Sequence, residues 1–159
     1  MLYKKSLTKE QALQKLKHYC GYQERCHSEV KQKLYDLGVN KKGHDELIAT
    51  LIEEKYLDEE RFAIAFAGGK FRMKQWGRVK IKYELKQKQV SDYSIKKALK
   101  QIGEAEYLDL LKQLAIEKYK DLKNEQYMVR KKKTMDYLLQ KGFELELIIK
   151  IADKIVNQT

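Results

Sequence analysis

The chain has 159 residues, 43% of them hydrophobic and 36% charged, and its formal net charge at pH 7 is +11. The hydrophobic fraction argues against an intrinsically disordered chain, and the sequence holds no proline to interrupt a helix. No apolar run approaches the ~20 residues of a transmembrane helix, the first residues do not look like a secretory signal, and two cysteines make a disulfide framework unexpected. We therefore expect a cytoplasmic protein.

Apolar residues recur at helical spacing along most of the chain, and no segment shows the alternation of a half-buried strand. Helix-start signals agree with this periodicity, because Thr8 and Gln11 form a candidate capping box and Asp58 is a candidate N-cap. Gly38 and Gly142 stand where a helix end favours a residue with positive φ. In chain order, these signals predict helices near residues 8–22, 28–37, 44–55, 59–74, 78–88, 92–101, 105–122, 126–141 and 145–156.

An internal repeat organises the predicted helices. Three segments of the chain align with one another and place equivalent leucines at Leu34, Leu85 and Leu138. Each segment has a further amphipathic stretch before and after it, so each unit carries three apolar helical stripes. The sequence therefore predicts an all-α fold of three tandem three-helix repeats, which are helix-turn-helix-like units, in an elongated, curved array. The predicted units are residues 1–56, 57–103 and 104–159.

The positive charge is concentrated in the second predicted unit. Residues 69–100 hold 11 basic and 2 acidic side chains, so this block contributes +9 of the net +11. Such a block can be a solvated face that keeps the protein soluble, or a surface for a polyanion or an acidic partner. The scarcity of neutralising acids favours the second interpretation.

On the predicted helix at the centre of this block, Ile81 and Leu85 define the buried stripe. Lys80 is expected to point well away from the stripe. A basic ridge with a spacing of four residues runs beside the stripe and consists of Arg78, Lys82 and Lys86.

Metal and catalytic sites find little support in the sequence. His18, Cys20, Cys26 and His27 match no ordinary spacing of zinc ligands, and we expect Cys20 to be a small core residue. No Ser/His/Asp or Cys/His arrangement is evident, nor is a pair of carboxylates that face a pocket. We therefore expect no enzyme activity, no cofactor and no metal.

Three further features have both a structural and a functional interpretation. Gly68 and Gly69 lack the rest of any phosphate-loop pattern, and we expect them to permit a close approach of two helices. Trp76 is expected to pack between helices, with base stacking as the alternative. The run RKKK at 130–133 either extends the basic surface or forms a solvated helical face.

Four stretches of sequence carry a family resemblance. YLDEERFA at 56–63 stands at the entry to the second unit, which continues with WGRVKIKYELKQKQV at 76–90. The first and third units contribute RCHSEVKQKLYDLGV at 25–39 and KKKTMDYLLQKGFELELI at 131–148. In these stretches, and in their order, the sequence resembles the RecX family of bacterial regulators of the RecA recombinase. The resemblance extends over residues 10–155.

Three positions depart from the family pattern. Lys55 stands where the family usually has a glycine before the aromatic residue of YLD, and Gln89 replaces the glycine after the helix of the second unit. Thr134 occupies an apolar position of the third unit. These departures concern local turn geometry.

The resemblance implies a cytoplasmic, non-enzymatic protein that is made of tandem three-helix repeats. Family members bind the RecA–DNA filament, lie along its helical groove and inhibit its ATPase and strand-exchange activities in DNA repair and recombination. The expected partners are thus the RecA filament and single- or double-stranded DNA, which the protein alone would bind weakly, and we expect a monomer that does not bind membranes. The alternative is a sequence-nonspecific DNA-binding helical protein without a recombinase partner, because both functions require a basic face.

The charge pattern, rather than the family motif, selects the residues that we expect on the filament-facing surface. The primary candidates are Arg72, Lys74, Arg78, Lys82 and Lys86. The secondary candidates are Arg61, Arg130, Lys131, Lys132 and Lys133.

Overall fold

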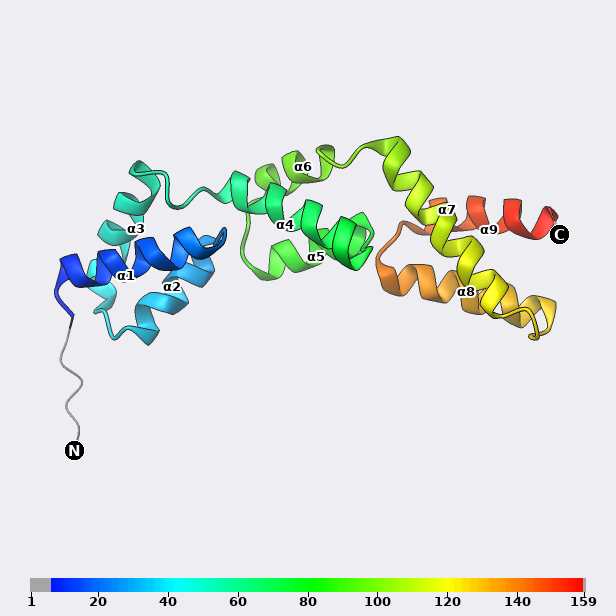
Figure 1. Ribbon diagram of the computed structural model, residues 1–159, viewed down its shortest axis with the longest axis horizontal. Helices are drawn as coiled ribbons and strands as arrows, with labels where there is room; N and C mark the ends of the chain where they lie inside the picture. Colours follow the sequence, from blue (N-terminus) through cyan, green and yellow to red (C-terminus); the bar gives the residue numbers. More distant parts are fainter. Residues whose placement is uncertain (1–6, 159) are drawn as a thin grey trace, which may run out of the picture.

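The computed structural model describes residues 7–158, and this part of the chain consists of helices and short connections without a β-strand. Figure 1 shows three helical groups that follow one another along an elongated molecule. The all-α prediction is confirmed, and both ends of every predicted helix lie within two residues of their expected positions. The helices are α1 (Lys9–Tyr22), α2 (His27–Asp36), α3 (His44–Glu53), α4 (Glu59–Lys74), α5 (Arg78–Gln87), α6 (Asp92–Lys100), α7 (Glu104–Asp121), α8 (Tyr127–Lys141) and α9 (Leu145–Asn157), with a short 3-10 turn, η1 (Lys41–Gly43), before α3.

The main helix–helix contacts group the helices as α1–α3, α4–α6 and α7–α9, which are named repeats 1, 2 and 3 below. The equivalent leucines of the sequence alignment, Leu34, Leu85 and Leu138, are all fully buried at the middle helix of their repeat. The prediction of three tandem three-helix repeats is therefore confirmed. The predicted unit boundaries after residues 56 and 103 fall in the connections between α3 and α4 and between α6 and α7, and they stay a prediction.

The same turn ends the middle helix of each repeat, whether or not it holds a glycine. Gly38, Gln89 and Gly142 have φ values of 75°, 63° and 96°. In each repeat the amide that follows the turn donates to the carbonyl of the buried leucine, at 3.0, 3.1 and 3.2 Å. Lys55 likewise adopts a φ of 63°. Both non-glycine departures from the family pattern thus keep a left-handed turn.

Thr134 shows how a polar residue is accepted at an apolar position. It is buried, and its hydroxyl Oγ1 donates to the carbonyl of Arg130, one turn earlier in α8, at 2.8 Å. The hydroxyl is therefore satisfied inside its own helix, without a partner from elsewhere in the core.

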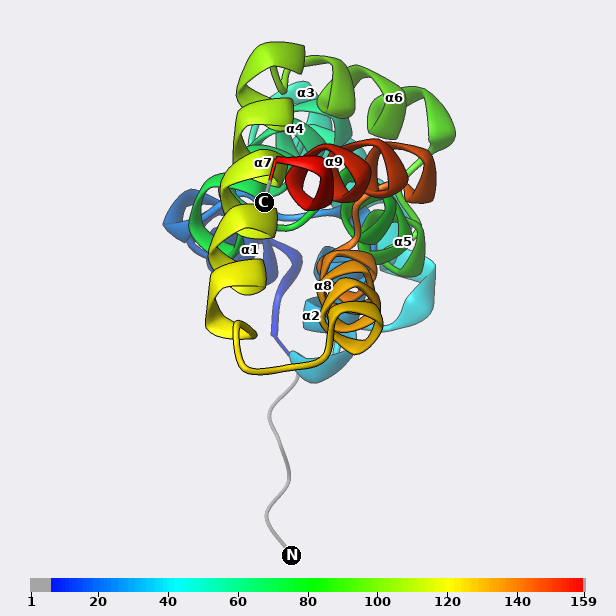
Figure 2. The same cartoon turned by 90° about the vertical axis from the view of Figure 1, so that its right-hand side faces the viewer.

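Two hydrophobic cores hold the array together. The first core lies within repeat 1 and includes Leu16, Leu34 and Leu51. The second core is shared by repeats 2 and 3, and it also takes in Cys26 from the start of α2. Figure 2 looks along the array from the end of repeat 3, with α7–α9 in front of the earlier helices. Repeats 2 and 3 therefore form one packed body, and repeat 1 forms another.

The close backbone approach occurs at a different glycine pair from the one that we predicted. A Cβ atom on Gly69 would meet nothing within 4 Å, and one on Gly68 would meet only the side chain of Arg72 from the same helix. The prediction for these two glycines is wrong, because that face of α4 packs against no other helix at this point. A Cβ atom on Gly77 would instead lie 2.4 Å from the backbone of Gly142, which belongs to repeat 3.

Within residues 7–158, no helix combines the length and the apolar character that crossing a bilayer requires.

Candidate nucleic-acid interface

Arg78, a primary candidate for the basic surface, lies in the contact between repeats 2 and 3, which is named joint 2. Its guanidinium is 3.2 Å from Glu104 and 3.3 Å from Glu144. The same group lies over the ring of Tyr107, with Cζ 3.8 Å from the ring centre. All three partners belong to repeat 3 or to the turn before α9, so Arg78 joins repeats and its charge is neutralised within the protein.

Backbone hydrogen bonds and a group of packed aromatic rings complete joint 2. The Gly77 N–H donates to the carbonyl of Lys141 at 2.8 Å. Tyr107 lies between Phe71 and Phe143, with ring centres 5.9 and 5.3 Å apart. Its hydroxyl accepts the backbone N–H of Arg78 and donates to Glu144. Burial, reinforced by the hydrogen bond to Glu144, raises the pKa of Tyr107 well above its usual value.

Arg61, a secondary candidate, occupies the corresponding contact between repeats 1 and 2, named joint 1. Its Nε lies 2.6 Å from Glu24, in the connection between α1 and α2, and its Nη2 donates to the Lys55 carbonyl at 3.0 Å. Ser28 Oγ donates across the same joint to the carbonyl of Lys88 at 2.8 Å. Joint 1 is thus made of a few polar contacts and Cys26, whereas joint 2 also has an aromatic core.

The other primary candidates are accessible. Lys74 and Lys82 are exposed and have no ion-pair partner among residues 7–158. Arg72 is 3.9 Å from Glu106, and Lys86 is 3.8 Å from Asp92. These two ion pairs are long and solvated, so both cations can still turn to an external anion.

Each cation of the run at 130–133 has a partner in or next to repeat 3. The guanidinium of Arg130 lies over the Tyr119 ring, with Cζ 3.5 Å from its centre, and Nε donates to the Tyr119 carbonyl at 2.7 Å. The three lysines approach carboxylates to distances of 2.6–3.4 Å. The lysine pairs are Lys131–Asp153, Lys132–Asp136 and Lys133–Glu125.

Repeat 2 carries a further group of lysines, which have aromatic rings rather than carboxylates as partners. The Nζ of Lys70 lies 5.4 Å from the ring centre of Phe66 and 5.0 Å from that of Trp76. Lys80 lies 4.6 Å from the Trp76 ring, and Lys88 lies 5.8 Å from the Phe66 ring. These five residues form a continuous series, Lys88–Phe66–Lys70–Trp76–Lys80, which is named the cation–aromatic row.

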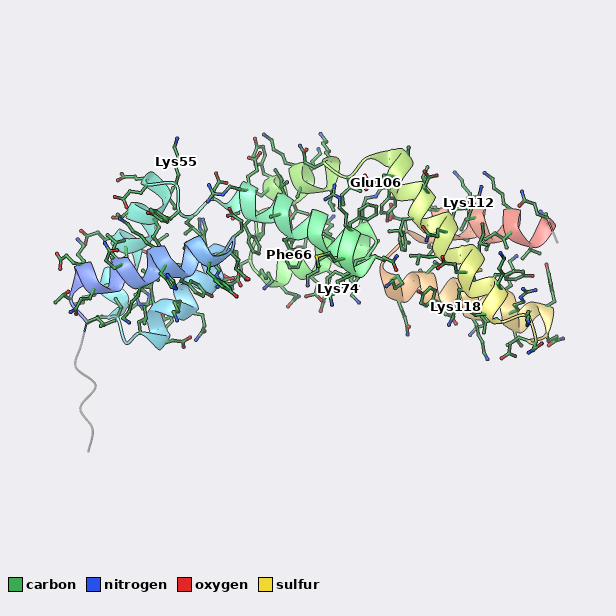
Figure 3. The ribbon with its side chains drawn as sticks, viewed as in Figure 1. Lys55, Phe66, Lys74, Glu106, Lys112 and Lys118 are labelled. Atoms are coloured by element: carbon green, nitrogen blue, oxygen red, sulfur yellow. The ribbon has the colours of Figure 1, made fainter. Side chains whose placement is uncertain are left out.

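The row lies where α4 and α5 meet. Figure 3 labels Phe66, which belongs to the row, and Lys74, both on α4. All five members are half-buried. Glu84 stands one turn from both Lys80 and Lys88 on α5, yet it forms no ion pair with either. The charges of the row lysines are therefore not neutralised by the described part of the protein.

Lys141 continues this positive region across joint 2. Its ammonium donates to the carbonyl of Lys74 at 2.8 Å. Burial, together with the positive charge of Lys80 nearby, lowers the pKa of Lys141. Two ammonium groups from different repeats thus lie close enough to repel each other.

The row was not predicted from the sequence. Lys80 was expected to point well away from the Ile81/Leu85 stripe, and its contact with the ring of Trp76 was not anticipated. A usable signal was present, since Phe66 and Trp76 each precede a lysine by four residues. Trp76 does pack against the second core, as predicted.

The two cysteines are buried in different cores, and burial raises the pKa of both thiols. The prediction that Cys20 is a core residue is confirmed. In the part of the chain that the structure describes, no three His, Cys, Asp or Glu side chains form a group that could hold a metal ion.

Comparison with known families places the chain beside one group of regulators. Residues 58–99 match the family model described as RecX, second three-helix domain, and residues 104–151 match RecX, third three-helix domain. Among solved structures, the crystal structure of RecX from Lactobacillus salivarius aligns with a TM-score of 0.84 and 22% identity, over 94% of this chain and 97% of that one. That structural similarity supports the fold.

Similar full sequences carry the description "Regulatory protein RecX". The protein from Clostridium tetani is 32% identical over 130 residues, which are 80% of this chain and 59% of the relative. The protein from Leuconostoc mesenteroides is 29% identical over 82% of this chain and 49% of the relative. The chain thus spans about half the length of some relatives, whereas it covers 94% of the one from Prosthecochloris aestuarii at 29% identity.

Proposed function

Because this chain belongs to the RecX family, we propose that it is a negative regulator of the RecA recombinase, which binds the RecA–DNA filament and inhibits its ATPase and strand-exchange activities. The family match over repeats 2 and 3 is the observation that carries this proposal. In this proposal the regulator acts in the cytoplasm as a monomer and has no enzymatic activity.

The shape and charge of the molecule support binding to a filament. Three repeats in a row give an elongated array, which can contact successive subunits of a polymer (Figure 1). The block at 69–100 places +9 of charge in the central repeat, where it can meet DNA phosphates or acidic recombinase side chains. The flanking repeats are close to neutral and supply contacts of other kinds.

Within the predicted surface, the structure favours some residues over others. We propose that Arg72, Lys74, Lys82 and Lys86 face the filament, because these cations are accessible. We retain Arg61, Arg78, Arg130, Lys131 and Lys133 only as contributors to the electrostatic field of this surface, because they are held in internal contacts. Lys132 stays a secondary candidate for direct contact, because its ion pair with Asp136 is solvated.

The direct test is the rate of ATP hydrolysis by the host recombinase on single-stranded DNA, measured with increasing amounts of this protein. We expect the rate to fall as the protein is added. A variant with Lys74, Lys82 and Lys86 changed to alanine should inhibit less while it stays folded, since none of these side chains is buried. An ATPase rate that the unmodified protein leaves unchanged would rule out the proposed regulation.

The alternative, a DNA-binding protein without a recombinase partner, is favoured by one observation, the lysines of repeat 2 that lack carboxylate partners. It predicts binding to naked DNA together with an unchanged recombinase ATPase. The same measurement therefore separates the two functions.

A further inference from the structure

We propose that the cation–aromatic row is a binding track for the phosphodiester backbone of a nucleic-acid strand, which Lys141 extends across joint 2. The inference deepens the proposed function and rests on it only for the location of that strand inside a filament. Binding of a free strand is independent of the recombinase and can be tested alone.

Charge compensation distinguishes the row from the other basic groups. Arg78 at joint 2 and the lysines at 131–133 have carboxylate partners, so an external anion would have to compete for them. Lys141 has only a neutral carbonyl as its partner, which leaves its charge in place. The three row lysines have only ring faces as partners. An aromatic ring attracts an ammonium group through its quadrupole but leaves the formal charge in place. The row therefore presents positive charge that no acid of the described chain neutralises.

The row lysines are also preorganised. A free lysine loses considerable side-chain entropy when it is fixed against a ligand. Lys70 is in contact with both rings of the row, and Lys80 and Lys88 with one ring each, so their side chains are already restrained. The half-buried stems also keep these ammonium groups close to the surface where α4 and α5 meet.

The arrangement of the row indicates the chemistry of its ligand. Trp76 already interacts with two ammonium groups, so its role is to position lysines and not to stack on a base. The three lysines are linked one after another through the two rings, and several positive charges in succession suit a ligand with a negative charge at every unit along its length. A phosphodiester backbone has this property, and it is read by lysines without sequence preference.

Lys141 supports the same assignment from the other side of joint 2. Lys80 packs against Gly142, the residue that follows Lys141. Burial lowers the pKa of Lys141 and the positive charge of Lys80 lowers it further, so an anion bound between the two lysines would relieve their repulsion. Such an anion would contact repeats 2 and 3 at once.

The protein provides its own probe for the test, because Trp76 is its only tryptophan. Titration with short oligo(dT), and in a second arm with a duplex of the same length, should change the tryptophan emission as the strand occupies the row. In the row variant Lys70→Gln/Lys80→Gln/Lys88→Gln, the affinity at ~0.1 M salt should fall about fivefold for each phosphate that the row no longer binds. The slope of log K against log salt should fall by about 0.7 per phosphate for the single strand and about 0.9 for the duplex.

A matched control variant removes three positive charges from lysines outside the row. Lys96, Lys100 and Lys112 are exposed and have no ion-pair partner among the described residues. Changing these three to glutamine should leave the emission change and most of the affinity in place. Equal reductions of affinity in the two variants would show that only net charge matters, and they would overturn the proposal.

Glu84 gives a second variant with the opposite sign. Glu84→Gln removes the single acid beside Lys80 and Lys88, so the affinity for the strand should rise. An unchanged or lower affinity would contradict the track. Poly-glutamate forms a further arm, and if it binds more tightly than oligo(dT) at equal salt, the row is a site for an acidic protein and the proposal fails.

The proposed function is tested separately, by measuring how far each variant inhibits ATP hydrolysis by the recombinase. A row variant that no longer binds the strand but still inhibits ATP hydrolysis supports the track and places the inhibitory contacts elsewhere. A row variant that keeps full strand affinity overturns the track, whatever happens to inhibition.

Discussion

Arg78 is one of 11 basic side chains in residues 69–100, yet its ion pairs and its ring contact all lie at joint 2. A cation in a basic block can thus serve the fold, and the difference is invisible in the charge count. The acids that neutralise it, Glu104 and Glu144, come from a part of the chain where basic and acidic residues are almost balanced. The effect of a mutation in this block therefore depends on whether the cation it removes has a partner inside the protein.

The first prediction follows from this role. Arg78→Ala removes two ion pairs and a cation–π contact and leaves Glu144 without its cation, so the free energy of unfolding should fall by about 1–3 kcal/mol. Lys82→Ala, four residues later on an exposed face, should change it by less than about 0.5 kcal/mol. Urea unfolding followed by circular dichroism measures both values. Equal values for the two variants would contradict the structural role of Arg78.

The second prediction concerns the left-handed turn at Gln89. Since φ is 63° there, Gln89→Gly should relieve backbone strain and raise the free energy of unfolding, by up to about 1 kcal/mol after the entropy of the unfolded chain is counted. Lys82→Gly, inside α5, should instead lower it by about 1 kcal/mol. Thermal melts distinguish the two signs. A decrease in stability on Gln89→Gly would mean that the Gln89 side chain contributes more than the strain costs.

At the scale of elements, Glu59 fastens the start of α4 to the start of α6. Its carboxylate accepts hydrogen bonds from the Ser91 N–H at 3.2 Å, from the Ser94 hydroxyl at 2.7 Å and from the Ser91 hydroxyl. Partial burial alone would raise the pKa of Glu59, but these hydrogen bonds outweigh it and lower the pKa below its usual 4.5. The charged form of the side chain is therefore the one that stabilises repeat 2.

A third prediction uses the sign of this shift. A carboxyl group with a depressed folded-state pKa stabilises the protein fully above its unfolded pKa, and this contribution disappears as the pH falls through the folded pKa. Glu59→Gln should therefore destabilise the protein at neutral pH, and the gap to the unmodified protein should narrow below pH 4.5. Urea midpoints at a series of pH values test this. A gap that stays constant down to the acid limit would show that Glu59 does not act through its charge.

The elements were predictable from the sequence because their causes are local. Apolar periodicity and caps such as Thr8 and Asp58 place helix ends within two residues, and the buried Leu85 follows from the same periodicity. The joints were not predictable, since the contact of Gly77 with Gly142 links residues that are far apart in sequence. Whether a cation is paired depends on such contacts too, as the partners of Arg78 in repeat 3 show. The cation–aromatic row, in contrast, had a local signal in the four-residue spacings of Phe66–Lys70 and Trp76–Lys80, which a count of charged residues does not include.

At the scale of the whole molecule, the two separate cores predict two steps of unfolding. Repeat 1 has its own core, whereas repeats 2 and 3 share one, and the smaller core should unfold first because it buries less apolar surface. Differential scanning calorimetry should show a van't Hoff enthalpy below the calorimetric enthalpy. Leu34→Ala should lower the free energy of unfolding of the first transition only, by about 2–5 kcal/mol. Leu138→Ala should lower that of the second transition by a similar amount. A single transition that both variants lower equally would contradict two bodies.

Joint 1 has a consequence for how long the protein stays bound to a polymer. A few polar contacts and the packing of Cys26 connect repeat 1 to the body formed by repeats 2 and 3, so a ligand that contacts both bodies is held by a bivalent molecule. When one body dissociates, the short connection between α3 and α4 holds it near its binding site. Its effective concentration there is on the order of millimolar, as for other short linkers. Rebinding then competes with escape, and residence time grows without any additional contact. Lengthening that connection would shorten the residence time while both surfaces stay intact.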